Sequence, residues 1–167
     1  FLVCMHHLLG CDERHVYEEL EKRFPDVYFM RCWMDPVMMK VSLTPEQKQR
    51  RSMLGARKAL PKDKTAVAIV GDNLRLSDDS DPVKFLQTLG QSAIQVQDAE
   101  NFDDYLAMGK AAFFVTRSPL SLYGVGSLAD RLGRPYVYLP CVVTDEEISK
   151  TMETLCGVAF EALGHVP

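Results

Sequence analysis

The sequence lacks an apolar run long enough to cross a membrane, because its longest apolar stretches, such as 66–70 and 111–115, are only strand-sized. Its opening residues have neither a basic flank nor a cleavage pattern, so we expect no signal peptide. It also lacks an excess of basic residues, since its formal net charge is −4. We therefore expect neither a membrane nor a nucleic acid as the main partner.

The sequence lacks a Cys-x-x-Cys pair, so neither a zinc knuckle nor a thioredoxin-type redox site is encoded locally. Its five cysteines are an odd number in a chain of 167 residues, which is large enough to fold without disulfides. We therefore expect reduced thiols and a cytoplasmic protein. No initiator methionine precedes the apolar residues Phe1-Leu2-Val3, and we expect the chain to be a piece of a longer polypeptide.

The common phosphate-binding loops are also missing. No Gly-x-Gly-x-x-Gly follows an expected strand, no Walker lysine follows a glycine loop, and Gly124 and Gly126 lie inside a helical pattern. A Gly-x-Ser-x-Gly nucleophile elbow is absent as well. We therefore expect neither nucleotide binding through these loops nor hydrolysis by a Ser-His-acid triad.

What the sequence does contain is a regular alternation of apolar runs and helical patterns. The apolar and β-branched runs predict strands at 1–3, 27–32, 65–70, 92–97, 111–115 and 135–139. Helical spacing, with caps such as Thr44 and Thr144, predicts helices at 12–24, 44–60, 81–90, 101–108, 122–132 and 144–163. This order predicts an α/β fold, a doubly wound Rossmann- or flavodoxin-like parallel sheet of about six strands with helices on both faces.

The best linker candidate is the polar stretch Pro61-Lys62-Asp63-Lys64. It divides the chain into two predicted portions. Residues 1–61 would be the first β/α portion of a domain that continues outside the chain, and residues 62–167 a four-stranded Rossmann-like α/β unit.

The expected strand ends carry most of the candidate functional residues. Because the carboxyl ends of parallel strands meet at one edge of a sheet, these residues can share a site despite their separation in sequence. They are Cys4 to His7, Asp35, Gly71-Asp72-Asn73, Thr116-Arg117-Ser118 and Pro140-Cys141. The planar fork of Arg117 suits a carboxylate or phosphate, although pairing with Asp72 or with solvent is an equal alternative. Asp72 and Asn73 are alternatively simple turn formers.

The first of these strand ends is rich in metal-ligating side chains. Cys4, His6 and His7 supply one thiol and two imidazoles, which are soft and borderline ligands. The alternative is a buried cysteine beside histidines that cap or line a loop. The methionines of the 33–39 loop likewise fit either adaptable packing or a soft-metal site.

Taken together, four segments resemble the nitrogenase component 1 family. Cys4 precedes Gly10 by six residues in Cys4-Met-His-His-Leu-Leu-Gly10-Cys-Asp12, as in the family pattern. Residues 66–73 look like the family's apolar strand ending in Gly-Asp-x-Asn, and 113–118 look like its strand ending in Cys-x-Arg-Ser. Residues 133–140 look like its Gly-x-Pro strand and following loop. The similarity is closest to the nitrogenase-like branch rather than to true nitrogenase.

The resemblance implies α/β domains paired as a dimer or pseudo-dimer, with metal clusters between domains. It implies that Cys4 ligates an iron–sulfur cluster, with His7 and His6 as alternative ligands or proton donors. It also implies that Arg117 and Ser118 lie beside a large metal cofactor, in a cofactor-binding set that we extend to Asp72 and Asn73. The sequence departs from the family where Val115 replaces the cofactor cysteine and Cys11 replaces the first aspartate of the turn.

The function implied by the resemblance is that of a fragment of a nitrogenase-like oxidoreductase subunit. Such a subunit passes electrons through an iron–sulfur cluster to a small substrate in an inter-domain cleft. The implied partners are a nitrogenase-like subunit, in a homo- or hetero-dimer, and an ATP-dependent iron–sulfur reductase. We expect the cluster in the full-length assembly and none bound to this chain alone.

Two other functions fit the same sequence. The first is a non-catalytic α/β module that binds a tetrapyrrole, a chelated metal or a cofactor precursor at the sheet edge. The second is a structural partner subunit, for which the basic helix predicted from Gln47 to Leu60 would be the contact surface.

Overall fold

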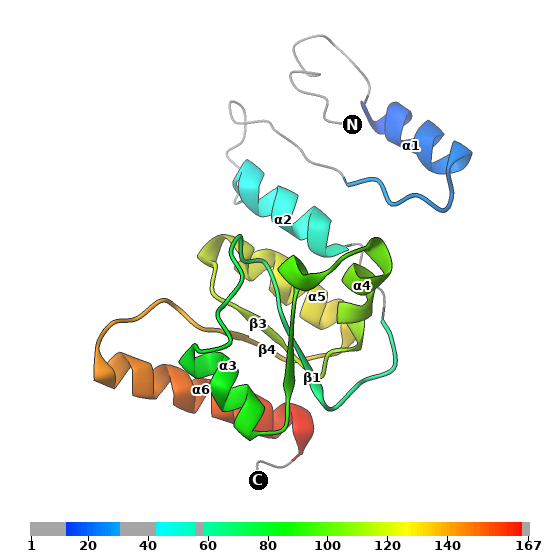
Figure 1. Ribbon diagram of the computed structural model, residues 1–167. Coiled ribbons are helices and arrows are strands. Elements are labelled where there is room, and N and C mark those ends of the chain that lie inside the picture. Colours follow the sequence, from blue (N-terminus) through cyan, green and yellow to red (C-terminus); the bar gives the residue numbers. More distant parts are fainter. Residues whose placement is uncertain (1–12, 31–42, 56–58, 165–167) are drawn as a thin grey trace.

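A four-stranded parallel sheet organises the computed structural model, which describes residues 13–30, 43–55 and 59–164 (Figure 1). The strand order is β2-β1-β3-β4, and every neighbouring pair is parallel. The strands are β1 (Ala66–Ile69), β2 (Ser92–Gln95), β3 (Phe114–Thr116) and β4 (Tyr136–Tyr138). The predicted α/β class with a parallel sheet is therefore confirmed.

Six α-helices and three 3-10 helices accompany the strands in the described part of the chain. The α-helices are α1 (Glu13–Arg23), α2 (Pro45–Gly55), α3 (Asp81–Thr88), α4 (Phe102–Ala107), α5 (Leu122–Leu132) and α6 (Asp145–Leu163). The 3-10 helices are η2 (Val96–Asp98), η3 (Met108–Lys110) and η4 (Pro119–Ser121). Among these described residues no helix has the length and apolar character needed to span a membrane.

The helix ends follow the capping chemistry of the sequence. Thr44 and Gln47 exchange side-chain-to-backbone hydrogen bonds at the start of α2, which is a capping box. The Thr144 hydroxyl accepts from the Glu147 backbone at 3.3 Å at the start of α6. α5 ends at Gly133, whose φ of 61° is in the left-handed region. These predicted helix boundaries are confirmed to within a few residues.

Helices cover both faces of the sheet, as expected for a doubly wound fold. Val67 and Ile69 of β1 pack in one core cluster with α3 and α6. Ala68 and Val70 pack in a second cluster with α5 and with Leu54 of α2. Figure 1 shows α3 and α6 together on one side of the strands and α2 and α5 together on the other.

The prediction of about six strands is not confirmed, because the described residues contain four. Residues 27–30 of the predicted strand 27–32 form no strand, so that part of the prediction is wrong. Val27 and Met30 are 51% and 44% exposed, and the Tyr28 hydroxyl donates to the Ser52 carbonyl at 2.8 Å. This segment is thus attached to α2 through a side chain instead of pairing with the sheet. Residues 1–3 and 31–32 lie outside the described residues.

The predicted linker and α2 both contact the four-stranded unit. The Lys62 ammonium donates to the Ala162 carbonyl at 2.5 Å, and Asp63 forms an isolated parallel bridge with Ala111. A Cβ added to Gly124 of α5 would lie 3.0 Å from the Arg51 Cα, so α2 and α5 pack closely. The division of the chain at residue 62 stays a prediction.

The order of connections creates a switch point between β1 and β3. The chain leaves β1 for α3 on one face and returns to β2, whereas it leaves β3 for α5 on the other face. In open α/β sheets, ligands bind where neighbouring strands diverge in this way, outside their carboxyl ends. The segments that follow β1 and end β3 therefore frame the candidate site.

Candidate functional site

Asp72 and Arg117 are brought together at the switch point. Asp72 follows β1, Arg117 follows β3, and the Arg117 backbone N–H donates to Asp72 Oδ2 at 3.1 Å. The Asp72 carboxyl is half-buried. Burial raises its pKa above the ordinary value, and this outweighs the opposite effects of the Arg117 N–H and of the Arg117 and Arg50 charges. An acidic side chain with an unusual environment thus lies at the expected edge of the sheet.

Gly71 allows the chain to turn sharply between β1 and Asp72. Its φ is +81°, a conformation that glycine adopts without strain. A Cβ at this position would lie 2.5 Å from the Ser121 Cβ, so there is no space for a side chain. The Ser121 hydroxyl donates to the Gly71 carbonyl at 2.6 Å, which fixes the turn against η4.

Arg50 of α2 is the most connected side chain at this edge. Its Nη1 donates to the Gly71 carbonyl at 2.5 Å and to Ser121 Oγ at 3.2 Å. Its Nη2 donates to Asn73 Oδ1 at 3.0 Å and to Glu46 Oε1 at 2.7 Å. The Arg50 side chain is only 12% exposed. It therefore attaches α2 to the turn that follows β1.

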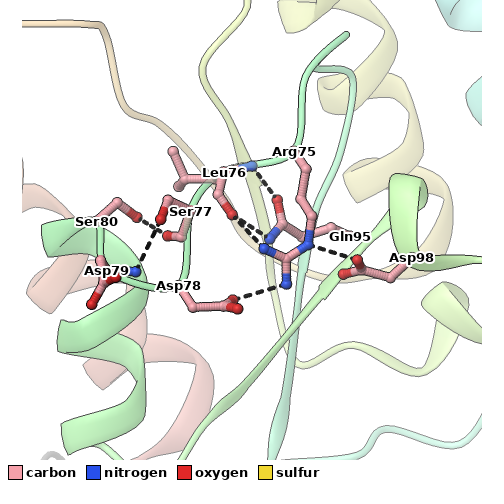
Figure 2. Close-up of polar contacts among 8 residues, drawn as sticks. All are labelled: Arg75, Leu76, Ser77, Asp78, Asp79, Ser80, Gln95 and Asp98. Atoms are coloured by element: carbon pink, nitrogen blue, oxygen red, sulfur yellow. Dashed lines mark hydrogen bonds and ion pairs between the residues drawn. The ribbon is translucent and has the colours of Figure 1, made fainter.

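The side chains of Gln95 and Arg75 form hydrogen bonds that hold the loop between β1 and α3, and we call them the clamp on this loop (Figure 2). Gln95, at the end of β2, is 1% exposed. Its amide accepts from the Leu76 N–H at 2.7 Å and donates to the Leu76 carbonyl at 2.8 Å. Arg75 adds a bond to the same carbonyl at 3.2 Å and pairs with Asp98 and Asp78. Residues from the end of β2 thereby set the path of the loop beside the site.

Two pockets open at the carboxyl edge, and they divide the predicted cofactor-binding residues. The first, which we call the α2 pocket, has a volume of about 210 Å³ and is lined by Asp72 and Asn73 together with residues of α2. The second, which we call the α6 pocket, has a volume of about 300 Å³ and is lined by Arg117 and Cys141 together with residues of α6. Ser118 is half-buried and lines neither of these pockets.

The Arg117 guanidinium makes no hydrogen bond or ion pair with any residue that the structure describes. Asp72 accepts from the Arg117 backbone rather than from the side chain, so the two do not form the side-chain pair considered above. The walls of the α6 pocket include the apolar side chains of Leu76, Leu139 and Met152. This pocket thus combines a cation that has no described partner with an apolar surface and, on its α3 side, the carboxyls of Asp79 and Asp81.

The predicted metal ligands Cys4 and His7 lie outside the described residues, as do His6 and Asp35. Within residues 13–30, 43–55 and 59–164 there is no group of three or more His, Cys, Asp or Glu side chains that could hold a metal ion. Iron–sulfur clusters are typically held by four cysteine thiolates. The described part of the carboxyl edge has one thiol, Cys141, so its residues do not by themselves fit a cluster.

Sequence reasoning missed Arg50, Ser121 and Gln95. The sequence indicates only a basic helix from Gln47 to Leu60, whereas the structure turns its Arg50 side chain toward the sheet edge. Its position one turn after Glu46 was the available signal, because an i,i+4 pair predicts a fixed arginine rather than a free one. Gln95 gave no signal, since its role depends on a contact with Leu76, 19 residues away.

A comparison with protein-family models gave no match, and a comparison with curated proteins gave none either. The fold and the site therefore define the class of the protein. It is a parallel α/β unit with two pockets at the switch point of its sheet.

Proposed function

We propose that this chain is part of a nitrogenase-like oxidoreductase subunit whose sheet edge binds the substrate or cofactor. The main support is the arrangement of three segments that resemble the family, 66–73, 113–118 and 133–140. They contain β1, β3 and β4, which are neighbours in the parallel sheet. The proposal requires that segments resembling one family in order of sequence also meet at one edge of the sheet.

In this proposal Arg117 anchors an anionic group in the α6 pocket. Arg117 is half-buried, and the apolar walls weaken competition from water for its N–H donors. Ser118, the next residue, would bind the same ligand after a small rearrangement of the loop before η4. Asp72 and Asn73 would hold the ligand, or the protein around it, from the opposite side of the switch point.

The electron-transfer part of the proposal rests on Cys4. An iron–sulfur cluster in the full-length assembly would receive electrons from an ATP-dependent iron–sulfur reductase and deliver them to the bound substrate. Cys4 would supply one thiolate, with His7 as an alternative ligand, and other ligands would come from other parts of the assembly. A second nitrogenase-like subunit would complete the dimer in the cytoplasm.

Anaerobic reconstitution tests this role. The full-length polypeptide that contains this chain is incubated with iron and sulfide, and bound iron and visible absorbance are measured. Cys4→Ala should lower both. Cys156→Ala, which changes a half-buried thiol of α6, is the matched control and should leave both unchanged. Equal iron content in the Cys4→Ala and unsubstituted proteins would show that Cys4 is not a ligand.

A non-catalytic binding module is the second candidate function. The preformed α6 pocket, with a guanidinium that has no described partner, favours tight binding of an anionic tetrapyrrole or cofactor precursor without turnover. Reductant-dependent turnover with a partner reductase would support the oxidoreductase. Tight binding without electron uptake would support the module instead.

A further inference from the structure

The α2 pocket differs from the α6 pocket in which charged side chain lacks a described side-chain partner: Asp72 in the α2 pocket and Arg117 in the α6 pocket. It lies on the other face of the sheet, between α2, the end of β1, η2 and α4, and its volume is about 210 Å³. That is roughly the volume of seven water molecules in the liquid, enough for a small organic molecule. Its apolar walls come from Met53, Leu54 and Val96, and Tyr105 adds an aromatic ring.

Arg50 is the arginine that lines this pocket, and its guanidinium already donates hydrogen bonds to described protein groups. Every nitrogen of the Arg50 guanidinium donates to a described acceptor, namely Glu46, Asn73, the Gly71 carbonyl and Ser121. An anionic ligand would have to displace these bonds and would also meet the carboxylates of Glu46 and Asp72. The pocket therefore disfavours anions.

Asp72 supplies the free binding capacity of the α2 pocket. Its carboxylate makes no ion pair with a described side chain, and its one described hydrogen bond uses the Arg117 N–H on Oδ2. A carboxylate accepts about four hydrogen bonds, so most of its lone pairs remain available. With Glu46 balanced by Arg50, the charge left over at the pocket is the negative charge of Asp72.

We propose that the α2 pocket binds a small organic cation with an apolar body, such as an amidine, guanidine or amine, whose charged group pairs with Asp72. The apolar body packs between Met53, Val96 and Tyr105. A planar cation is favoured because it forms two parallel hydrogen bonds to a half-buried carboxylate. This site shares Asp72 with the ligand-holding residues of the proposed function, but its cation binding does not require Arg117 or Cys4.

Benzamidine is the probe for the experiment, because it joins an aromatic ring to an amidinium group. Binding to the purified protein is measured by calorimetry and by amide chemical shifts in NMR. We expect saturable binding with the largest shifts at 71–73, Val96 and Tyr105. Benzamide, which has the same shape without the charge, should bind at least tenfold more weakly.

Two matched variants make the test specific. Asp72→Asn keeps the shape of the side chain and should weaken benzamidine binding at least tenfold. Arg117→Gln changes the α6 pocket and should leave benzamidine binding unchanged or tighten it slightly, because a nearby positive charge is removed. Three results would overturn the inference. Either the Asp72→Asn variant binds benzamidine as tightly as the unsubstituted protein does, or the unsubstituted protein binds benzamide as tightly as benzamidine. The third is that the NMR shifts map to the α6 pocket.

Benzoate separates this inference from the proposed function. As an anion with the same ring it should bind at the α6 pocket and lose affinity in Arg117→Gln, while Asp72→Asn should not weaken it. Failure of benzoate with success of benzamidine would count against the Arg117 anchor alone. The opposite pattern would overturn the cation site alone.

Discussion

Replacing Gln95 with leucine should show how much stability the clamp on the β1–α3 loop provides. Gln95 is 1% exposed, and its amide makes both a donor and an acceptor bond with the backbone of Leu76 (Figure 2). In Gln95→Leu the Leu76 carbonyl still accepts from Arg75 at 3.2 Å. The buried Leu76 N–H, in contrast, loses its hydrogen-bond acceptor.

The expected loss in the free energy of unfolding follows from the unequal fates of the Leu76 N–H and the Leu76 carbonyl. A buried N–H without an acceptor costs about 1–3 kcal/mol, and the lost bond to a carbonyl that keeps another donor adds about 1 kcal/mol. The leucine side chain offsets part of this because it needs no hydrogen-bond partners in the core. We expect a decrease of about 2–3 kcal/mol in the free energy of unfolding.

Gln95→Glu provides a second, pH-dependent reading of the same contact. Burial raises the pKa of a carboxyl group, so the folded-state pKa of this glutamate should exceed its unfolded value of about 4.3. The protonated acid can both donate to and accept from the Leu76 backbone, whereas the carboxylate can only accept. The variant should therefore be close to the unsubstituted protein near pH 4 and lose stability as the pH rises through the folded-state pKa.

Urea unfolding followed by circular dichroism at about pH 4 and pH 8 measures both effects. Gln87→Glu is the control, because Gln87 is an exposed residue of α3 and surface changes rarely exceed about 0.5 kcal/mol. Equal unfolding midpoints for Gln95→Leu and the unsubstituted protein would refute the clamp. A Gln95→Glu variant with the same relative stability at both pH values would refute the burial of its side chain.

Three further changes test the carboxyl edge. Gly71→Ala should destabilise the fold by about 2–4 kcal/mol in urea unfolding, because φ is +81° and the new Cβ would lie 2.5 Å from the Ser121 Cβ. Gly164→Ala, with the same φ and open space, should cost about 1 kcal/mol, and equal losses would contradict the steric argument. Arg50→Gln should lower the free energy of unfolding by about 2–3 kcal/mol. Arg50→Lys should restore less than half of this loss, because lysine lacks the planar guanidinium. Full restoration by lysine would show that charge alone matters. Burial raises the pKa of Asp72, so the contribution of Asp72 to stability should fall as the pH rises from about 3.9 through that folded-state pKa, a loss that Asp72→Asn does not have. Its stability relative to the unsubstituted protein should therefore increase across this window, and a pH-independent difference would contradict the direction of the shift.

Several elements were predictable because their signals are local. The capping box at Thr44, the cap at Thr144 and the glycine stop at Gly133 each depend on residues within one helical turn. The strand at 66–69 was predictable because a continuous β-branched and apolar run suits a strand that is buried on both faces. The helix caps among these signals depend only on neighbouring residues, whereas the strand also needs neighbours in the sheet.

The prediction of a strand at 27–32 is wrong for the described residues 27–30, because a strand also depends on contacts that are not local. An apolar run predicts a strand only where a sheet edge is available to pair with it. Tyr28 instead contacts Ser52, so the backbone of 28–30 stays outside the sheet. The apolar pattern was present, but residues 27–30 pair with no strand among the residues that the structure describes.

The candidate site could be predicted only in part. Asp72, Asn73 and Arg117 were recognised because strand ends in a parallel sheet lie on one edge. Their division between two pockets was not predictable, since it depends on which face each helix covers. Arg50 was missed because its carbonyl partner is 21 residues away in the sequence.

The sequence by itself determined the alternation of strands and helices from residue 66 to residue 163, the capped helix ends, and the positions of Asp72 and Arg117 after strands. These features follow from contacts over a few residues and from the burial of apolar runs. Only the tertiary structure decided the strand order β2-β1-β3-β4, and with it the switch point between β1 and β3. It also decided that Arg50 is occupied while the Arg117 guanidinium has no described partner. The physical reason is that hydrogen-bond partners distant in sequence are selected by the packing of helices on the two faces, which no local pattern specifies.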